Sequence, residues 1–335
     1  MKIALPPPNW PSFAKSIDNR MLRFSPVFVR ALFLVGTLAT RVGGTTYPLT
    51  MPDGLGGTIT LTSRPQRIVS LAPNATEILF AIGAGDRVVG VTRYCNYPPD
   101  VKRLPKVGGY TDISVETVVG LSPDLVLASR GNPRTMLATL SSHGLKLLVA
   151  VGQESFEEIE RAIVRVGRAT DNEREARQVC ENMERVIAPV REAIGSVEHR
   201  RRVYFGSLSA PYRAAGPASF IGQCIEMAGG ENVARGVSEP WPILSVERII
   251  ERDPEVLIEG FRPNPGGDDR RNELLARLRA DRVWSQVTAV REGRVYLLDD
   301  DTIHRPGPRL AQAIAEIARL LYPERFSSHG VEKPQ

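Results

Sequence analysis

The chain has 335 residues and a formal net charge of +5, with 42% hydrophobic and 24% charged residues. This length and apolar content are enough for one to three domains with their own cores, and the composition excludes a disordered or collagen-like protein. The basic residues are interleaved with acidic ones, as in RAIVRVGRATDNEREARQ, which favours solvated helix surfaces over a nucleic-acid-binding stripe.

Residues 1–46 are typical of a secretory signal rather than of a folded domain. The run Val27–Ala39 is apolar except for Arg30, and small residues follow it. The pattern places the true start near Met21 and is too short and too interrupted for a membrane span. No cysteine lies near the expected cleavage region. We therefore expect a soluble, exported periplasmic protein without a lipid anchor, in which residues 47–65 form a short N-terminal segment.

From residue 66 onward, short β-branched runs alternate with helical segments. Strands are predicted at 67–71, 88–91, 125–128 and 146–151. Helices are predicted at 78–82, from Ser114 onward and at 136–143, whereas residues 73–77 are expected to turn the chain. Strands that alternate with helices in this way imply a parallel sheet covered on both faces.

Residues 155–198 are almost entirely helical in pattern, with two helices predicted at 155–168 and 171–194. The alternation then resumes, with strands at 202–205 and 295–298 and helices at 219–228, 274–278 and 308–321. We predict an α/β protein of two parallel-sheet (Rossmann-like) lobes, at 66–168 and 200–322, followed by a tail at 323–335. A single long rigid α-helix within 169–199 joins the lobes. Because a helical bridge resists bending, the lobes should close by only a small angle.

One sequence unit occurs twice, 131 residues apart: ISVETVVGLSPDLVLA at 113–128 and LSVERIIERDPEVLIE at 244–259. An aromatic residue stands six positions before the glutamate of each copy, Tyr110 before Glu116 and Trp241 before Glu247. A serine before a helix and a glutamate in its first turn are also ordinary capping chemistry. The repeat indicates two similar lobes that share one cleft, where a ligand can be held.

The three cysteines, Cys95, Cys180 and Cys224, form no CxxC motif and no Cys/His cluster, so a zinc site is not expected. An exported protein could join one pair, but the sequence does not select it, and unpaired thiols fit at least as well. The chain also lacks GxSxG, P-loop and HExxH motifs. The acidic run Asp299–Asp301 with His304 is the best remaining indication of a metal-dependent enzyme.

Several motifs together resemble a known family. They are RIVSLAPNATEILFAIGAG, YCNYPPDV, VGGYTDISVETVVGLSPDLVLA, AGGENV and EPWPILSVERIIERDPEVLI. The chain resembles, from about residue 66 to 322, the periplasmic substrate-binding proteins of ABC importers for cobalamin, iron-siderophores and haem. The combination of NYPP with the later PWP and SVE elements is most similar to the cobalamin-binding members.

The resemblance implies roles for individual residues. Glu116 and Glu247 match the two surface glutamates, one on each lobe, that dock onto arginines of the permease dimer. Tyr94, Tyr110 and Trp241 match aromatic positions that line the cobalamin cleft. The chain departs from the family pattern at Tyr110, where cobalamin binders carry a tryptophan, and at Ser129-Arg130, which replaces an aromatic-bearing turn.

The residues themselves support part of this assignment. Tyr94, Tyr110 and Trp241 stand beside Pro or Gly or within expected loops, where an aromatic ring can stack on a flat macrocycle. For Tyr97, before two prolines, packing within the loop is the simpler interpretation. Arg130 and Arg305 could bind ligand carboxylates or phosphate in a bidentate manner, although arginines of this kind are more often surface charge.

The function expected from the resemblance is non-enzymatic capture of a corrinoid such as cobalamin and its delivery to an ABC permease dimer with its ATPase subunits. No cofactor is expected, since cobalamin would be the transported ligand, and neither nucleic acid nor a partner copy is expected, so that the protein would be a monomer. An iron-siderophore or haem binder of the same transporter class remains the alternative. The metal-dependent enzyme at Asp299–Asp301 and His304 remains a second one.

Overall fold

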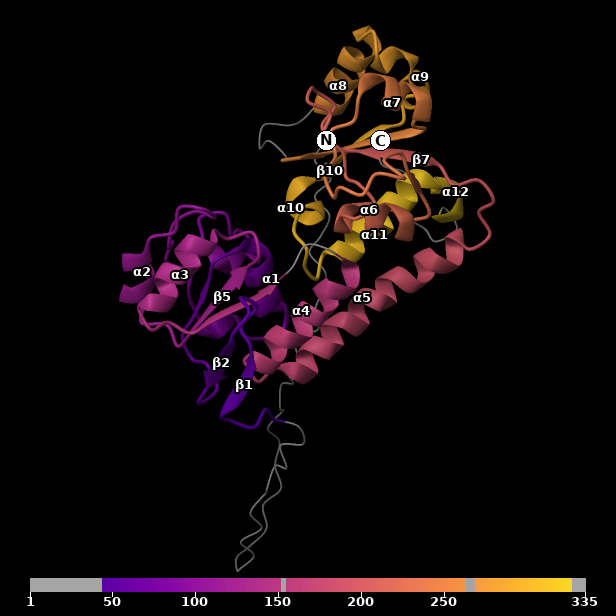
Figure 1. The fold of residues 1–335 in the computed structure, drawn as a ribbon. Helices are drawn as coiled ribbons and strands as arrows, with labels where there is room; N and C mark the ends of the chain where they lie inside the picture. Colours follow the sequence, from indigo (N-terminus) through magenta and orange to yellow (C-terminus); the bar gives the residue numbers. More distant parts are fainter. Residues whose placement is uncertain (1–43, 152–154, 263–268, 327–335) are drawn as a thin grey trace, which may run out of the picture. The chain divides into compact units, whose positions relative to one another are not determined.

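The computed structural model describes residues 44–151, 155–262 and 269–326 (Figure 1). The predicted signal segment therefore lies outside the described residues except for its last three positions, as does most of the predicted tail. In the described part of the chain, the search for a helix both long and apolar enough to span a bilayer found none.

The first sheet is parallel and has the strand order β4-β3-β5-β6. Its strands are β3 (Ile68–Ser70), β4 (Val88–Val91), β5 (Leu125–Ser129) and β6 (Leu147–Val151). The connecting helices are α1 (Pro73–Ala81), α2 (Val115–Gly120) and α3 (Arg134–Ser142), with short 3-10 turns at Gly85–Arg87 and Pro99–Arg103. Every residue of β3 and β5 is buried, as expected for central strands covered on both faces.

Residues 73–77 form the first half of α1 instead of the predicted turn, so that prediction is wrong. Pro73 occupies the first turn of the helix, where its missing N–H costs no hydrogen bond. Thr76 Oγ1 bonds back to the Ala72 carbonyl oxygen at 3.1 Å. Asn74 and Glu77 are buried, so the polar pattern that resembled a turn belongs to side chains with partners inside the protein.

A hairpin precedes the first sheet within the segment 47–65, for which no strand was predicted. Strands β1 (Leu49–Pro52) and β2 (Thr58–Leu61) pair antiparallel and alternate buried and exposed residues. Asp53 Oδ1 accepts hydrogen bonds from the amides of Leu55 and Gly57 and so closes the turn. The Val149 amide donates to the Asp53 carbonyl oxygen at 2.8 Å, which attaches the hairpin to β6.

Two helices lead from the first sheet to the second. Helix α4 (Phe156–Ala169) packs on β6, and α5 (Glu173–Ile194) packs on both α4 and α11 (Leu310–Leu321), as Figure 1 shows. A Cβ atom added at Gly167 would lie 2.4 Å from the Ala176 Cβ, so glycine allows the close approach of α4 and α5. Both helices lie within two residues of their predicted bounds.

The second sheet repeats the topology of the first, with the parallel order β8-β7-β9-β10. Its strands are β7 (Arg202–Phe205), β8 (Glu231–Asn232), β9 (Val256–Phe261) and β10 (Val295–Asp299). The helices are α6 (Phe220–Met227), α7 (Val246–Arg252), α8 (Arg270–Ala280), α9 (Thr288–Arg291), α10 (Asp300–Ile303), α11 and α12 (Pro323–Phe326), with a 3-10 turn at Trp284–Gln286. The prediction of two parallel-sheet α/β units is confirmed, with one copy of the sequence repeat in each.

The cysteines of the described chain are all free thiols. Cys95 and Cys224 are buried, and Cys180 is partly buried. Cys95 Sγ contacts the hydroxyls of Thr76 and Thr92 at 3.2 and 3.1 Å. The unpaired alternative considered from the sequence is thus the observed one.

Candidate functional site

The predicted ligand-binding residues follow the carboxyl ends of strands. Tyr94 comes shortly after β4, Arg130 directly after β5, and Arg305 after β10 by way of α10. Trp241 lies in the long connection between β8 and α7. In open α/β sheets this end of the strands is where ligands are bound. The topology therefore places these residues where a site is expected.

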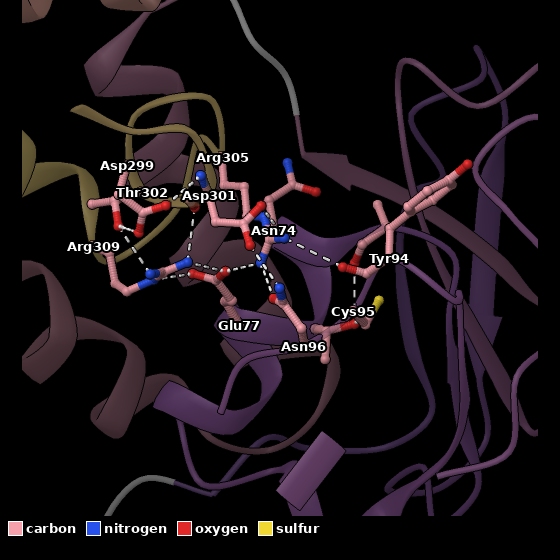
Figure 2. A network of polar contacts seen from close by, with 12 residues as sticks. Asn74, Glu77, Tyr94, Cys95, Asn96, Asp299, Asp301, Thr302, Arg305 and Arg309 are labelled. Atoms are coloured by element: carbon pink, nitrogen blue, oxygen red, sulfur yellow. Dashed lines mark hydrogen bonds and ion pairs between the residues drawn. The ribbon is translucent and has the colours of Figure 1, made fainter. Parts of the chain in front are cut away.

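A buried carboxylate on α1 organises the region between the two sheets (Figure 2). Glu77 is 3% exposed, and it receives hydrogen bonds from two arginines that follow β10. Arg309 donates Nε to Oε2 at 2.8 Å and Nη2 to Oε1 at 2.7 Å, a bidentate pair. Arg305 Nη1 donates to Oε1 at 3.0 Å. These bonds join helix α1, next to the first sheet, to the segment after the last strand of the second.

Arg305 is buried, and its guanidinium bridges several groups of the site. Besides Glu77 it contacts Asn96 Oδ1 at 2.7 Å, the Tyr94 carbonyl oxygen at 3.3 Å and Asp301 Oδ1 at 2.6 Å (Figure 2). Its polar atoms are thus engaged in fixing the loop that carries Tyr94. Binding of a ligand by Arg305 stays a prediction, and the contacts give the residue a positioning role for Tyr94.

Tyr94 and Tyr97 have different surroundings. The Tyr94 ring is 46% exposed and points away from the network that holds its backbone (Figure 2), with the guanidinium of Arg93 5.6 Å from its centroid. The guanidinium of Arg309 lies 4.3 Å from the centroid of the Tyr97 ring. Tyr97 is also exposed, at 40%, and each ring has an arginine over it, but only the arginine beside Tyr97 belongs to the Glu77 network.

Trp241 is partly buried and stacks on His304, with ring centroids 6.2 Å apart and an angle of 28° between the planes. Phe220 packs against Trp241 edge-on, at a centroid distance of 6.4 Å. His304 Nδ1 lies 2.7 Å from Asp300 Oδ1, and Arg262 Nε lies 3.2 Å from Asp300 Oδ2. The hydrogen bond from His304 holds the pKa of Asp300 below its usual value, and the charge of Arg262 acts in the same direction.

His304 and Arg305 are neighbours in the chain, and each of them contacts one of the predicted aromatic residues. Arg305 holds the backbone of Tyr94, and His304 stacks on Trp241. A cavity of about 560 Å³ adjoins this region at the ends of β9 and β10, with Gly260, Arg262 and Asp300 in its lining. This volume is within the usual range for small-molecule sites.

Tyr110 and Arg130 lie together at the end of β5. Tyr110 Oη donates to Ser129 Oγ at 3.3 Å, and Asn132 Nδ2 donates to the carbonyl oxygens of Tyr110 and Leu71, each at 3.0 Å. Burial raises the pKa of the Tyr110 phenol. Glycine at 131 is required for this packing, because a Cβ there would lie 2.1 Å from Tyr110 Oη. Arg130 is exposed.

The acidic run Asp299–Asp301 does not converge on a common point. Asp299 accepts hydrogen bonds from the Asp301 amide and the Thr302 hydroxyl, while Asp300 pairs with His304 and Asp301 with Arg305. Within the described ranges, no group of three or more His, Cys, Asp or Glu side chains could hold a metal ion. The second alternative, a metal-dependent enzyme at this run, is not supported, because helix capping and ion pairing already occupy the carboxylates.

Glu116 and Glu247 are exposed and occupy the same position in α2 and α7. Each follows a serine that caps the helix: Ser114 Oγ accepts from the Thr117 amide at 3.1 Å, and Ser245 Oγ accepts from the Arg248 amide at 3.2 Å. A hydrogen bond with the backbone at the start of α7 lowers the pKa of Glu247, and a hydrogen bond with the Ser245 side chain lowers it further. The capping expected from the sequence is confirmed, and docking stays a prediction.

Several residues of the site were not identified from the sequence. Glu77, Asn96 and Arg309 carry the network between the two sheets. Glu77 and Asn96 lie within the motifs that resemble the family, but no role was assigned to them, and Arg309 lies outside those motifs. A buried polar position inside a helix could have indicated Glu77, but only if residues 73–77 had been interpreted as helix.

Comparisons with known proteins agree with this geometry. The family model described as periplasmic binding protein matches residues 68–302. The cobalamin-binding protein of Halobacterium salinarum (strain ATCC 29341 / DSM 671 / R1) is 33% identical over 282 residues, which are 82% of this chain and 74% of that protein.

Two solved structures are similar along almost their whole length. The periplasmic vitamin B12-binding protein BtuF of Vibrio cholerae is 25% identical, with a TM-score of 0.64 over 77% of this chain and 97% of BtuF. The periplasmic haem-binding protein RhuT from Roseiflexus sp. RS-1 is 28% identical, with a TM-score of 0.67 over 78% of this chain and 99% of RhuT. Both are named as periplasmic binding proteins. With its family match and its two sheets of identical strand order, the chain belongs to the periplasmic binding protein family.

Proposed function

We propose that this protein is exported, captures a corrinoid such as cobalamin between its two α/β lobes and delivers it to the permease of an ABC importer. The observation that carries the proposal is that His304 stacks on Trp241 while its chain neighbour Arg305 holds the backbone of Tyr94. Tyr94 follows the first sheet, Trp241 belongs to the second, and both expose aromatic surface. Two rings from different lobes suit the faces of a large flat macrocycle.

The relatives support the same ligand class. A cobalamin-binding protein and a vitamin B12-binding protein are among the similar proteins. A haem-binding protein of comparable similarity makes haem the second candidate. Both ligands are planar tetrapyrroles that hold a metal, so either would use the same aromatic residues.

Titration calorimetry of the purified protein against cyanocobalamin, ferric haem and a ferric siderophore distinguishes the candidates. We expect tight binding of cyanocobalamin and much weaker binding of the other two. Preference for haem or for the siderophore would replace the corrinoid with that ligand. If none of the three were bound, the proposed function would be wrong.

Trp241→Ala tests the aromatic contact directly. We expect it to weaken cyanocobalamin binding by about 2 kcal/mol or more, as is typical for a central aromatic anchor. Tyr94→Ala should have a smaller effect, because its ring is more exposed. The control is Tyr296→Ala on β10, whose ring contacts Arg271 of α8 and none of the site residues named above. Unchanged affinity in a folded Trp241→Ala variant would make Trp241 a loop-packing residue.

A further inference from the structure

The two exposed glutamates of the repeated unit have no basic partner within their own chain. Glu116 on α2 and Glu247 on α7 each stand two residues after the serine that caps the helix. Within the described ranges, neither forms an ion pair with an arginine or a lysine. Arg248, which follows Glu247 directly, contacts Glu251 instead, at 3.5 Å. Both carboxylates are therefore available to a cation of another molecule.

An exposed apolar side chain lies close in the chain to each of these glutamates. The described residues contain five exposed large hydrophobic side chains: Leu55, Tyr94, Tyr97, Val119 and Ile243. The two tyrosines belong to the candidate site, and Leu55 lies in the turn between β1 and β2. Val119 is 37% exposed and stands one helical turn after Glu116, on the same side of α2. Ile243 is 57% exposed and stands four positions before Glu247, where the chain enters α7.

The packing of the two helices does not use these exposed side chains. Two other apolar residues attach the start of each helix to the core of its lobe: Ile113 and Val118 for α2, Leu244 and Ile249 for α7. The surface after Val119 is also open, because a Cβ added at Gly120 would meet no atom within 4 Å. Val119 and Ile243 are thus left on the surface with their apolar groups in water.

The two patches, Glu116 with Val119 and Glu247 with Ile243, lie one on each lobe of a single chain. A partner that binds both needs two equivalent sites, which a two-fold symmetric dimer supplies. Pairing between exposed charges contributes little free energy and mainly selects and orients a partner. Removal of apolar side chains from water at the centre of a contact is what holds such a complex together.

We propose that Val119 and Ile243 are apolar docking contacts for the two halves of a dimeric permease, whose matching surfaces each carry a basic and an apolar side chain. The inference rests on the proposed function, because it takes the permease of an ABC importer as the partner. Glu116 and Glu247 steer the encounter, and Val119 and Ile243 slow dissociation.

The test measures the rates at which the protein, loaded with cyanocobalamin, binds to and leaves the permease–ATPase complex of its importer in lipid nanodiscs, at low and at high salt. Val119→Ser combined with Ile243→Ser should raise the dissociation rate at least about tenfold at both salt concentrations. Glu116→Ala combined with Glu247→Ala should instead slow association and reduce its dependence on salt. The conservative pair Val119→Ile and Ile243→Leu should behave like the unaltered protein.

The control is Leu55→Ser, because Leu55 is as exposed as Val119 but lies on the hairpin. It should change neither rate, and an effect equal to that of the apolar double variant would contradict the proposal. Cyanocobalamin affinity should be the same in all variants. Weaker binding of cyanocobalamin by Ile243→Ser would place Ile243 in the ligand site, which Trp241 reaches two positions earlier, and its docking role would be wrong.

The remaining outcomes separate this inference from the proposed function. If the apolar double variant dissociates at the unaltered rate while the glutamate variant associates more slowly, the apolar contacts are wrong and the proposed function stands. If light scattering shows a dimer of this chain that the apolar double variant abolishes, the patches bind a second copy and not a permease. If the unaltered protein binds cyanocobalamin but not the permease–ATPase complex, delivery to a permease fails and this inference with it.

Discussion

Glu77 is the residue on which contacts between the two halves of the chain converge. It is nearly inaccessible to solvent and is paired with two arginines that lie 228 and 232 positions later in the chain. Burial of a carboxylate without partners would be very unfavourable, and the two arginines supply the partners that Glu77 needs. Asp301 balances part of the second positive charge by its contact with Arg305.

Glu77→Gln should therefore destabilise the protein by about 3–5 kcal/mol, because it removes the counter-charge of Arg309 and leaves the buried Arg305 with Asp301 alone. Denaturant unfolding measures the change. The control is Glu157→Gln, which removes an exposed i,i+4 partner of Arg161 and should have no measurable effect. Equal effects of the two substitutions would contradict the importance assigned to the buried pair.

At this scale the sequence marked aromatic residues as candidates but did not mark the charged residues of the Glu77 network. Tyr94 and Trp241 stand beside glycine, proline or polar loop residues, a local signal that the sequence displays. The partners of Glu77 are set by the packing of segments more than 200 residues apart, and no local pattern encodes such a pairing. The contact between His304 and Asp300 joins residues four positions apart. By contrast, Trp241 and Gly260, which lie against the His304 ring, are far from it in the sequence and are brought to it only by the fold.

The two copies of the repeated helix-turn-strand unit share more than their sequence. They also share the turn conformation and the hydrogen bonds that follow each helix. After α2 and α7 the chain passes through a left-handed residue, Ser122 or Asp253, and then a proline. The acid that follows binds a backbone amide at the start of β3 or β7. Asp124 Oδ1 accepts from the Arg67 amide at 3.0 Å, and Glu255 Oε2 accepts from the Arg202 amide at 3.1 Å.

The two arginines are equivalent as well. Arg67 Nη2 donates to the Leu121 carbonyl oxygen at 2.8 Å, at the end of α2. Arg202 Nε donates to the Arg252 and Asp253 carbonyl oxygens, each at 3.0 Å, at the end of α7. Cations at the carboxyl end of a helix are favourable. Each sheet is thus attached to its repeated helix by an acidic residue and an arginine at equivalent positions.

Glu255→Gln tests this attachment through its pH dependence. Although burial raises the pKa of Glu255, hydrogen bonds from the Arg202 amide and His199, with the charge of Arg202, hold it below the ordinary value of 4.5. A lowered pKa in the folded state means stability that is complete above the unfolded pKa and is lost as the pH falls through the folded one. The substitution should cost about 1–3 kcal/mol near neutral pH.

Stability curves of the two proteins should therefore converge as the pH falls below about 4.5. A difference that stayed constant between neutral pH and pH 3 would show that the carboxylate charge does not carry the effect. The same comparison for an exposed acid outside the repeat, Glu324→Gln, should give no difference at any pH.

Most strands and helices were predictable because their apolar periodicity is strong. Strands β4 and β7 occupy the predicted residues, and α4 and α5 differ by at most two positions at each end. The hairpin of β1 and β2 was missed, because its strands lie beside the apparent signal segment.

For the whole molecule, the two sheets have the same strand order and each carries one exposed glutamate at the start of a repeated helix. The duplication could be predicted from the sequence, because residues 113–128 and 244–259 share the same pattern of amino acids. It was not enough to predict how the halves contact one another, since the Glu77 network uses residues outside the repeat. Glu116 and Glu247 are not part of that network.

Because Glu116 and Glu247 are not part of the candidate site, docking and ligand binding can be tested separately. If Glu116 and Glu247 dock onto the permease, replacing both with Ala should leave cyanocobalamin affinity unchanged while abolishing uptake and stimulation of the transporter ATPase. Replacement with Arg should be more severe, because like charges at an interface cost more than a missing pair. A single replacement should have a partial effect, since the other lobe still presents its own glutamate.

Stability measurements on the same variants distinguish docking from helix capping. Ser114 and Ser245 retain their capping bonds when the glutamates are removed, so the double Ala variant should unfold at nearly the same denaturant concentration as the unaltered protein. The matched control is the pair Glu175→Ala and Glu192→Ala on α5, which removes the same charge from a helix outside the repeat and should transport normally. If the Glu116 and Glu247 double variant instead transported normally and lost stability, the glutamates would act only on their own helices. The repeated unit would then be needed for the stability of the two lobes and not for contact with the permease.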